Sequence, residues 1–399
     1  MRPMGGSNRS ERAGGSHAPR RPVVAVMFGG RSGEHEVSIQ SGHSIFGAID
    51  RERWRPIPIG ITRDGAWHLG ADASIFDRVD DVRTARIATD ADRSTEVIPA
   101  PSSADGSVPI LARDTGREVE RVDVFFPILH GTLGEDGSVQ GLLRMLGAPF
   151  VGPDLGASAD AMDKTVAKRL LADAGIPVAR SVTVARAEPR PDFERILADL
   201  GPRVFVKPAN LGSSVGIRPA DDPVACADAI EHALRFDRRA LIEEAIDGRE
   251  IEFAALGNEE IEISIPGEIV PRDGFYSYEA KYVDSESATL RAPAEMGPEA
   301  LEEGRRIAER AYRALGCEGM SRIDLFLKAD GSWVVNEINT LPGFTAISMF
   351  PRLFDLSGLP YPRLLDRLLE LALERHRRDL ALARVRDDAL NAGPSRPTA

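Results

Sequence analysis

Four polar residues near the C-terminal end of the chain have the types and the spacing of a metal site. They lie in two β-rich runs separated by Asp330-Gly331, a dipeptide typical of two-residue hairpin turns. With the turn at this dipeptide, Asp324 lies directly across from Glu337, and Arg322 lies across from Asn339. Because side chains alternate along a strand, all four are expected on one face of the hairpin.

This face predicts chemistry with a divalent cation. Two carboxylates directly across from each other repel, and a cation between them removes the repulsion. Oxygen atoms of Asp, Glu and Asn side chains are the hard ligands that Mg²⁺ prefers, usually shared with substrate phosphates. The alternative is a pair of solvated carboxylates on an exposed hairpin, and a longer turn would shift the register. The other face is expected to enter the core with Ile323, Leu325, Leu327, Val334 and Ile338.

A second candidate site follows a predicted strand at residues 203–207. Lys207 ends this strand, and the small residues that follow it up to Gly216 leave backbone N–H groups free to surround an anion. The Walker pattern G-x-x-x-x-G-K-[ST] is absent, which argues against a P-loop ATPase. An unoccupied turn is the alternative for this loop. Lys164, alone on a mostly apolar helix, is by itself more typical of a surface lysine than of a phosphate ligand.

The elements that must position these residues form three predicted units. Strands alternating with helices predict an open parallel sheet at the N-terminal end, with function at the carboxyl ends of its strands. The second unit starts with a helix that Ser158 can cap, and the third is richer in antiparallel signals. Residues 70–120 are polar and poorly periodic and are expected to form a surface excursion, preceded by a hairpin turn at Asp64-Gly65. Strands are expected at 23–28, 56–61, 122–129, 149–151, 182–184, 203–207, 240–245, 250–256, 260–265, 323–327 and 333–338, and helices at 37–49, 138–146, 158–175 and 224–234.

The fold class predicted from this order is mixed, α/β followed by α+β. The expected divisions are a disordered tail (1–22), an N-terminal α/β domain (23–151), a central subdomain (152–240), a C-terminal subdomain (241–376) and a charged tail (377–399).

Composition excludes several classes of protein. The 399 residues include 62 acidic and 50 basic ones, a net charge of −12 that argues against a nucleic-acid partner. No apolar run approaches the roughly 20 residues that span a bilayer, and no apolar segment follows the first 22 residues as in a signal peptide. Only two cysteines, Cys226 and Cys317, occur, which is typical of a reducing, cytoplasmic location.

Seven motifs in a fixed order carry a resemblance to a known family. The sequence resembles the D-alanine–D-alanine ligases of the ATP-grasp superfamily over residues 23–375, apart from the excursion at 70–120. The motifs are FGGRSGEHEVS (28–38), HGTLGEDGSVQG (130–141), MDKTVAK (162–168), VKPANLGSSVG (206–216), YEAKYV (278–283), SRIDLF (321–326) and NEINTLPGFTAIS (336–348). The resemblance implies a three-unit ATP-grasp architecture and an enzyme that makes a peptidoglycan precursor.

The resemblance also implies how ATP is held, in a cleft between the second and third units. Lys164 and Lys207 would hold its phosphates, under a loop that carries Ser213, Ser214 and Val215. At the adenine end, Glu243 would bind the amino group and the Ile246 backbone the ring, with Glu244 between them, and Glu250 would bind the ribose. The sequence departs from several relatives in having Ala245 in place of an aromatic residue, which leaves the stacking of adenine open. Asp324, Glu337 and Asn339 would hold two Mg²⁺ or Mn²⁺ ions, and activation by K⁺ is left open.

The implied reaction has two steps. The carboxylate of one D-alanine takes the γ-phosphate of ATP, and the amine of a second D-alanine then attacks the resulting acyl phosphate. Arg322 and the Gly343 N–H would stabilise the oxyanion. Around the first D-alanine the resemblance places Glu34, Ser213 and His130, and around the second it places Lys281 and Ser348. A lid loop at 272–290 would carry Tyr282, which donates a hydrogen bond toward Ser213 and Glu34, together with Tyr276 and Tyr278.

Other interpretations remain open at the level of single residues. Glu34 is also typical of a solvated turn, His130 of a buried core histidine, and Ser348 of a helix start. The alternative functions are a D-alanine–D-serine or D-alanine–D-lactate ligase and another ATP-grasp carboxylate–amine ligase. A non-catalytic ATP-binding protein and a dinucleotide-binding oxidoreductase are also considered, and the missing G-x-G-x-x-G argues against the latter. The resemblance suggests a homodimer, with no membrane partner.

Overall fold

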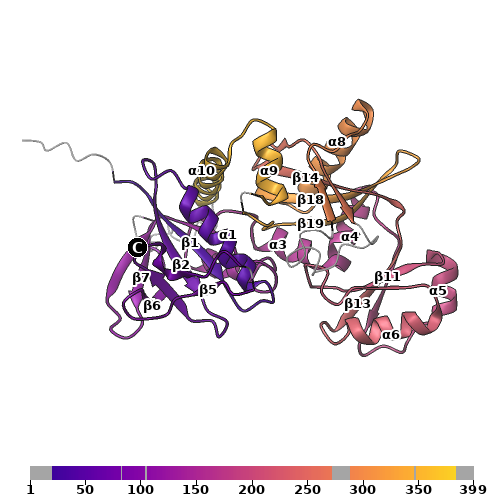
Figure 1. The fold of residues 1–399 in the computed structure, drawn as a ribbon, viewed down its shortest axis with the longest axis horizontal. Coiled ribbons are helices and arrows are strands. Elements are labelled where there is room, and N and C mark those ends of the chain that lie inside the picture. Colours follow the sequence, from indigo (N-terminus) through magenta and orange to yellow (C-terminus); the bar gives the residue numbers. More distant parts are fainter. Residues whose placement is uncertain (1–19, 82, 104–105, 272–287, 346, 383–399) are drawn as a thin grey trace, which may run out of the picture.

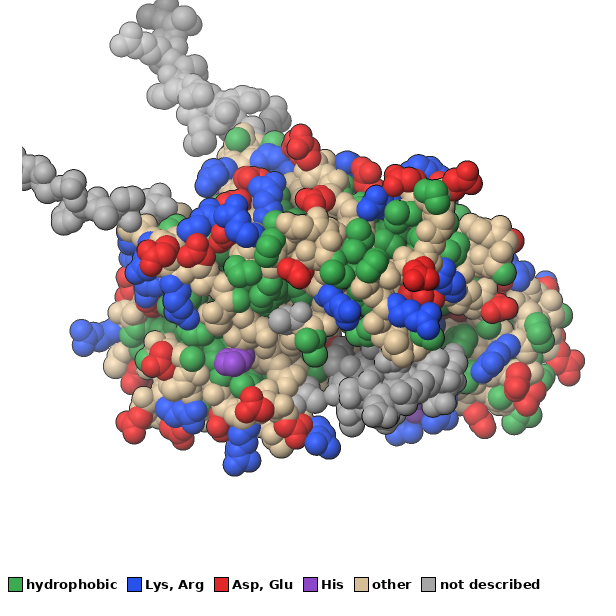
Figure 2. All heavy atoms as spheres, turned by 45° about the horizontal axis from the view of Figure 1, so that its top comes forward, with side chains coloured by type: hydrophobic (Ala, Val, Ile, Leu, Met, Phe, Trp, Pro, Cys, Tyr) green, Lys and Arg blue, Asp and Glu red, His purple; other side chains and the backbone are tan. Residues whose placement is uncertain are grey.

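The computed structural model describes residues 20–81, 83–103, 106–271, 288–345 and 347–382, and arranges them in three units (Figure 1). The N-terminal unit lies at one end, and the two other units, each built on its own sheet, lie at the opposite end. Figure 2 shows acidic and basic side chains interspersed over one face. Within the described ranges, no helix is long and apolar enough to cross a membrane.

The N-terminal unit is a seven-stranded sheet in the order β8-β7-β6-β3-β2-β1-β9. Strand β1, next to the edge strand β9, pairs in parallel with β2 and β9. Every residue of β1 is buried, because a strand covered on both faces needs a continuous apolar run. The strands expected at 23–28, 56–61 and 122–129, the two helices and the β2–β3 hairpin are confirmed. The strand expected at 149–151 is wrong, because Phe150 makes only an isolated bridge to Phe125. The strands are β1 (Val23–Gly29), β2 (Arg55–Ile61), β3 (Trp67–Gly70), β6 (Ser94–Pro99), β7 (Val108–Ala112), β8 (Glu118–Val122) and β9 (Val124–Pro127), with helices α1 (His35–Ala48) and α2 (Ser138–Met145).

The prediction of a surface excursion at residues 70–120 is wrong. Strands β6, β7 and β8 extend the sheet by antiparallel pairing beyond β3. They are short and half-buried, Pro99 ends β6 and Pro109 lies inside β7, so their alternation of polar and apolar residues is weak in the sequence. The same region also contains the 3₁₀ turn η1 (Ala73–Ile75) and the small pair β4 (Phe76–Asp77) and β5 (Arg86–Ile87).

The expected single helix at 158–175 is two helices, α3 (Leu155–Met162) and α4 (Lys164–Asp173). Ser158 does not cap it but lies buried inside α3. Asp154 caps α3, and the Asp163 carboxylate caps α4 by accepting from the N–H groups of Thr165 (3.0 Å) and Val166 (3.2 Å). The break at Asp163 places Lys164 at the first turn of α4.

The central unit is a four-stranded antiparallel sheet, β10-β13-β11-β12, with two helices. The predicted domain boundary at residue 240 is wrong, because it falls inside β13, which pairs with β10 and β11 throughout its length. The sheet therefore extends this unit to Glu244. Its elements are β10 (Ser181–Ala185), α5 (Phe193–Leu200), β11 (Val204–Pro208), β12 (Arg218–Ala220), α6 (Pro223–Ala233) and β13 (Arg239–Glu244).

The C-terminal unit is a sheet in the order β17-β16-β14-β18-β19, with β15 paired to β14. Helix α8 packs on it so closely that a Cβ added at Gly304 would lie 2.8 Å from Trp333 and 2.9 Å from Phe253. Its elements are β14 (Gly248–Gly257), β15 (Glu262–Ile263), β16 (Gly267–Pro271), β17 (Ala288–Arg291), α8 (Pro298–Ala314), β18 (Gly319–Lys328), β19 (Trp333–Asn339), α9 (Met349–Leu356) and α10 (Tyr361–Leu380). The expected charged tail therefore starts within α10.

The hairpin of β18 and β19 has the predicted pairing but not the predicted turn. Asp324 pairs with Glu337 and Arg322 with Asn339. The loop holds three residues rather than two, since the Lys328 N–H bonds the Ser332 carbonyl oxygen at 2.9 Å and Gly331 takes a positive φ of 83°. This longer loop shifts the register by one residue, and a bulge beside Asp324 shifts it back.

The bulge also changes which residues of β19 enter the core. Val334 was expected there, but it is only half-buried, and Trp333 and Val335 are buried in its place. The extra residue of the bulge is Asn336, whose side chain accepts a hydrogen bond from Lys207 at 3.4 Å on the cleft side. The sequence signal was ambiguous because Trp333, Val334 and Val335 are all apolar.

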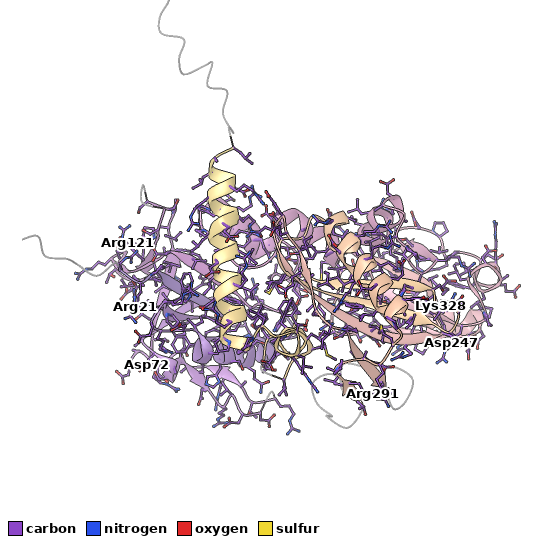
Figure 3. All side chains as sticks on the ribbon, turned by 90° about the horizontal axis from the view of Figure 1, so that it is seen from above. Arg21, Asp72, Arg121, Asp247, Arg291 and Lys328 are labelled. Atoms are coloured by element: carbon purple, nitrogen blue, oxygen red, sulfur yellow. The ribbon has the colours of Figure 1, made fainter. Side chains whose placement is uncertain are left out.

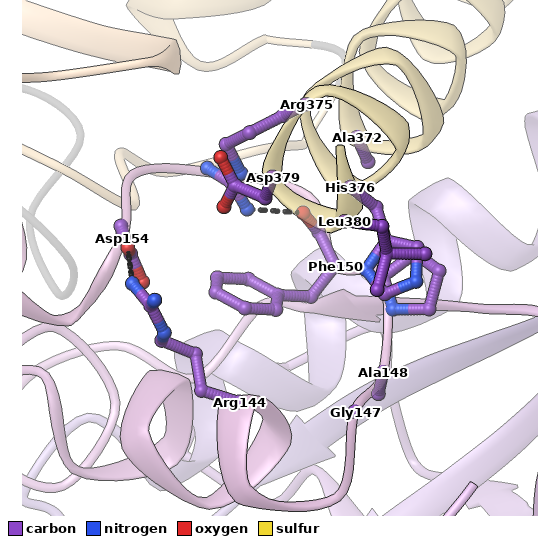
Figure 4. A pocket seen from close by; sticks show the side chains of 11 residues that line it. Arg144, Gly147, Ala148, Phe150, Asp154, Ala372, Arg375, His376, Asp379 and Leu380 are labelled. Atoms are coloured by element: carbon purple, nitrogen blue, oxygen red, sulfur yellow. Dashed lines mark hydrogen bonds and ion pairs between the residues drawn. The ribbon is translucent and has the colours of Figure 1, made fainter. Parts of the chain in front are cut away.

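Helix α10 joins the N-terminal unit to the C-terminal sheet. Seen from above, it lies between the part that carries Arg21, Asp72 and Arg121 and the part that carries Asp247, Arg291 and Lys328 (Figure 3). Beside a small cavity of about 80 Å³, buried Arg375 of α10 donates to the Phe150 carbonyl oxygen at 2.7 Å (Figure 4). It also donates to the Gly152 carbonyl oxygen. Its guanidinium also lies 4.5 Å from the centre of the Phe150 ring. Because its donors bind backbone carbonyl groups, we call Arg375 a structural junction: it attaches α10 to the end of the N-terminal unit.

Replacing Arg375 with methionine is expected to lower the free energy of unfolding by about 2–6 kcal/mol, because two buried carbonyl groups lose their donor at about 1–3 kcal/mol each. The exposed Arg377 on the same helix turn gives the matched control. Arg377→Met should change the free energy of unfolding by no more than about 0.5 kcal/mol. Urea unfolding measures both, and equal midpoints for the two variants would contradict the junction.

Candidate active site

Two cavities lie side by side between the units, with volumes of about 600 Å³ and about 390 Å³. We call them the substrate cavity and the nucleotide cavity. They share three lining residues, Gly212, Ile269 and Glu337. Glu337, which is predicted to coordinate the metal, thus lies where a molecule bound in one cavity would meet a molecule bound in the other.

The substrate cavity lies between the N-terminal unit and the C-terminal sheet. It brings together residues that the sequence separates by as much as 314 positions, from Glu34 to Ser348. The predicted site residues that line it are Glu34, His130, Ser213, Arg322, Glu337, Asn339, Gly343 and Ser348.

The nucleotide cavity lies between the central and C-terminal sheets, as the sequence resemblance implies for ATP. Of the residues predicted for ATP, Val215 is not among those that line it, and Ser213 lines the substrate cavity instead. The predicted residues around it are Lys164, Lys207, Ser214, Glu243, Glu244, Ile246, Glu250 and Glu337.

Lys164 is buried and held in the cleft, not at the surface. Its Nζ donates to the Leu211 carbonyl oxygen at 2.7 Å and lies 3.4 Å from Glu337 Oε2. The alternative interpretation of Lys164 as a surface lysine is therefore excluded. The position follows from the Asp163 cap, which starts α4 at this residue.

Glu243 is buried between two lysines. Its Oε2 lies 2.5 Å from Lys207 Nζ, and its Oε1 lies 2.5 Å from Lys168 Nζ. Burial raises the pKa of Glu243, but the two ammonium groups outweigh burial and hold this pKa below its ordinary value. Burial lowers the pKa of Lys207, yet the charges of Glu243, Glu337 and Glu250 outweigh it and raise the pKa. Both groups are therefore charged at neutral pH.

The loop after β11 reaches across to the N-terminal unit. Ser213 and Ser214 have positive φ angles of 51° and 58°, a conformation that few residues other than glycine adopt. Ser213 Oγ donates to Glu34 Oε1, and Glu34 is only 8% exposed. A Cβ at Gly131 would lie 2.5 Å from Glu34 Oε2, so that glycine leaves room for the carboxylate. Glu34 is thus not the solvated carboxylate of the alternative interpretation.

His130 is buried and also lines the substrate cavity. Its Nδ1 donates to the Leu341 carbonyl oxygen at 3.0 Å, and its Nε2 lies 2.9 Å from Ser41 Oγ. Burial lowers the pKa of His130, but Glu135, 3.6 Å from Nδ1, and the charge of Glu34 outweigh burial and raise the pKa. These contacts join the N-terminal unit to the chain that follows β19.

Arg322 is held by two carboxylates. Its guanidinium binds both oxygens of Asp324 at 2.7 Å, and its Nε lies 3.2 Å from Glu252 Oε1. Asn339 Nδ2 donates to Asp324 Oδ2 at 2.9 Å. Glu252 stands directly across from Asp324 on β14, so the two strands supply the acids around this guanidinium.

Gly343 and Ser348 lie close together in the loop before α9. Ser348 precedes the first turn of α9, but its side chain does not cap the helix. Its Oγ accepts from the Thr345 N–H at 3.1 Å and lies 2.8 Å from Thr345 Oγ1. A Cβ at Gly343 would lie 3.2 Å from Ser348 Oγ, so this glycine keeps the approach to the serine open.

Four polar residues of the cleft were missed in the sequence: Lys168, Glu252, Glu135 and Asn336. A signal existed for the first two. Lys168 lies one helical turn after Lys164, and Glu252 shares a strand face with Glu250. Asn336 had no signal, because its position depends on the bulge.

The remaining predicted residues lie outside the described ranges. These are Lys281 and Tyr282, with Tyr276, Tyr278 and most of the lid loop predicted at 272–290. The last residues of that predicted loop belong to β17 (Ala288–Arg291).

The fold and the two joined cavities match those of the ATP-grasp ligases. Two family models match the chain, "D-ala D-ala ligase N-terminus" over residues 23–153 and "D-ala D-ala ligase C-terminus" over residues 170–370. The chain belongs to the D-alanine–D-alanine ligase family, which confirms the resemblance and the predicted fold class.

Individual proteins agree with this assignment. The D-alanine–D-alanine ligase of Oceanobacillus iheyensis is 44% identical over 92% of this chain and 99% of its own length. D-alanine–D-alanine ligase A of Escherichia coli is 45% identical over 90% and 98%. Two solved structures superpose well: the VanG D-Ala:D-Ser ligase of Enterococcus faecalis (TM-score 0.78, 35% identity, 88% and 100% covered) and a Bacillus anthracis D-alanine–D-alanine ligase complexed with ATP (TM-score 0.66, 25% identity, 90% and 99% covered).

Proposed function

We propose that this chain uses ATP to join two D-alanine molecules into D-alanyl-D-alanine, releasing ADP and phosphate, for the synthesis of peptidoglycan precursors. One observation carries the proposal: the nucleotide and substrate cavities meet at Glu337. A carboxylate bound in one cavity can therefore approach the γ-phosphate of a nucleotide bound in the other.

In the nucleotide cavity, Lys164 and Lys207 bind the phosphates of ATP, and the loop carrying Ser214 and Val215 covers them. Ile246, Glu244 and Glu250 line the same cavity. Ile246 would bind the adenine ring through its backbone, with Glu244 beside it, and Glu250 would bind the ribose. Because Glu243 is bound by two lysines, its main role is to position them, and its proposed contact with the adenine amino group is secondary.

The hairpin fits divalent cations. Mg²⁺ is usually held by one or two carboxylates together with substrate phosphates and water, and Asp324, Glu337 and Asn339 supply that donor set. No group of three or more His, Cys, Asp or Glu side chains stands close enough to hold a metal without phosphates, as far as the described residues go. Two Mg²⁺ or Mn²⁺ ions would offset the charge of the phosphates during transfer.

In the substrate cavity, Glu34 binds the ammonium group of the first D-alanine, with Ser213 fixed beside it and His130 lining the same subsite. The carboxylate of this D-alanine takes the γ-phosphate and becomes an acyl phosphate. Arg322 and the Gly343 N–H stabilise the negative charge that develops on its carbonyl oxygen when the second D-alanine attacks. Closure around the acyl phosphate keeps water out of this step.

The second D-alanine is proposed to bind through its carboxylate to Lys281 and Ser348, beneath a lid that carries Tyr282. We also propose that the protein works as a cytoplasmic homodimer. Both cysteines of the chain, Cys226 and Cys317, are buried and unpaired, which suits a reducing compartment.

The function is tested by product analysis with equal D-alanine, D-lactate and D-serine at pH 7. D-alanyl-D-alanine is expected to dominate, because a phenol such as that of Tyr282 is ordinarily neutral at this pH and does not repel an incoming ammonium group. A protonated histidine at such a position would repel that ammonium group and favour the hydroxy acid. D-serine is the closer competitor, since one added hydroxyl is a weak basis for rejection.

Three outcomes would contradict the proposal in different ways. Predominant D-alanyl-D-serine would favour the activity that the name of the VanG relative states. Predominant depsipeptide would show that Tyr282 does not set the choice. Phosphate release that follows L-alanine, glycine or glutamate in place of D-alanine would indicate another carboxylate–amine ligase.

A further inference from the structure

The nucleotide cavity contains more acidic than basic residues, although its proposed ligand is a polyanion. Five glutamates and three basic residues line it. Two of the glutamates are neutralised by neighbouring arginines, since Arg249 binds Glu268 at 2.7 Å and Arg180 binds Glu244 at 2.6 Å. Glu243 contacts Lys207, one of the two lysines proposed to bind phosphate. It also contacts a second cation, which has no ligand contact in the proposed function.

That cation is Lys168 of α4. Its side chain is 7% exposed, it is not among the residues that line the nucleotide cavity, and it donates to the Ala179 carbonyl oxygen at 3.3 Å. It lies one helical turn after Lys164 on the same face of α4. The two oxygens of Glu243 are thus divided between the lysine that faces the cavity, Lys207, and one that does not, each at 2.5 Å.

We propose that Lys168 is a positioning residue for ATP binding, because it neutralises Glu243 and so leaves the charge of Lys207 available to the nucleotide phosphates. Lys168, Glu243 and Lys207 together carry one positive charge. Without Lys168, the buried pair of Glu243 and Lys207 is neutral, and the full charge of the carboxylate holds the ammonium group away from the phosphates. This inference rests on the proposed function of Lys207 and adds a residue that acts through it.

The test compares equilibrium binding of ATP and of adenosine, in the presence of Mg²⁺, to the wild-type chain and to Lys168→Met. ATP binding is expected to weaken about ten- to a hundredfold, the range of one charged hydrogen bond. Adenosine, which lacks phosphates, should bind within about threefold of its wild-type affinity. In turnover, the KM for ATP should rise more than kcat falls. Lys328→Met, an exposed lysine on the β18–β19 hairpin, is the matched control.

A charge-compensating variant separates this role from a merely structural one. Lys168→Met combined with Glu243→Gln again leaves Lys207 with one unopposed positive charge, so ATP affinity should return to within about threefold of wild type. A double variant as weak as Lys168→Met alone would overturn the proposal, and so would normal ATP binding by Lys168→Met. If Lys168→Met does not fold, Glu243→Gln alone decides: it should bind ATP more tightly, and weaker ATP binding with unchanged adenosine binding would overturn the proposal.

Failure of the proposed function gives a different result. A wild-type chain that binds no ATP would refute both proposals. A wild-type chain that binds ATP but shows no phosphate release with any amino acid would refute only the ligation reaction, and the comparison of Lys168 variants would still hold.

Discussion

Replacing Asp324 or Glu337 with alanine is expected to lower dipeptide formation by at least about 10²–10³-fold, the scale of losing one electrostatic contact to the reacting groups. Glu337 lies where the two cavities meet, and Asp324 pairs with it across the hairpin. Each change removes a proposed oxygen ligand, so the charge of the γ-phosphate is less compensated during transfer. The measurement is phosphate release with saturating ATP and D-alanine.

Controls for this prediction address folding and metal binding separately. Lys328→Met lies on the same hairpin with a 40% exposed side chain and should keep the wild-type rate. Glu337→Gln keeps the shape of the side chain, so it should fold normally and need a higher Mg²⁺ concentration for half-maximal activity. Removal of divalent cations with a chelator should stop the wild-type enzyme. Near-normal turnover in folded Asp324→Ala or Glu337→Ala would refute the hairpin as a metal site.

The second large effect is expected from Arg322→Lys. A lysine keeps the positive charge but loses the planar fork, which here binds Asp324 through two nitrogens and reaches Glu252 as well. A single ammonium group cannot keep these contacts and also stabilise the oxyanion. The rate should therefore fall about 10²–10³-fold, the effect of removing one oxyanion donor.

Arg306→Lys, an exposed arginine on α8, is the matched control and should leave the rate unchanged. Steady-state turnover and ATP binding are measured together, and ATP affinity should change little because Arg322 lines the substrate cavity. An Arg322→Lys variant that retained more than about a tenth of the wild-type rate would refute the oxyanion role.

Much of the site could be predicted because its signals are local. The pairing of Asp324 with Glu337, the lysine at the end of β11 and the glycine-rich loop after it all depend on residues within one hairpin or one turn. Family resemblance then placed the separate motifs in one enzyme before any contact between them was known. The prediction of one helix at 158–175 was wrong for a local reason too. Asp163 caps a second helix through its side chain, whereas Ser158 lies inside the first helix and caps neither.

The pairing of Asp324 with Glu337 was predicted correctly, but the predicted two-residue turn was not. The turn is one residue longer than expected, and the bulge at Asn336 compensates for it. Both features maintain the contacts of Trp333 and Val335 with the core, and those contacts involve α8 and β14 as well as the hairpin. A pattern confined to the two strands does not contain that information.

By itself, the sequence determined the family and the order of the motifs, and it predicted which residues are proposed to bind phosphate and metal. Only the tertiary structure decided that Ser213 meets Glu34 across 179 residues and that Glu243 is divided between Lys207 and Lys168. The physical reason is range: alternation and capping act over a few residues, whereas these contacts depend on how three distinct sheets pack around one cleft. In that cleft, burial strengthens each charge interaction, and the arrangement of the charges sets the chemistry.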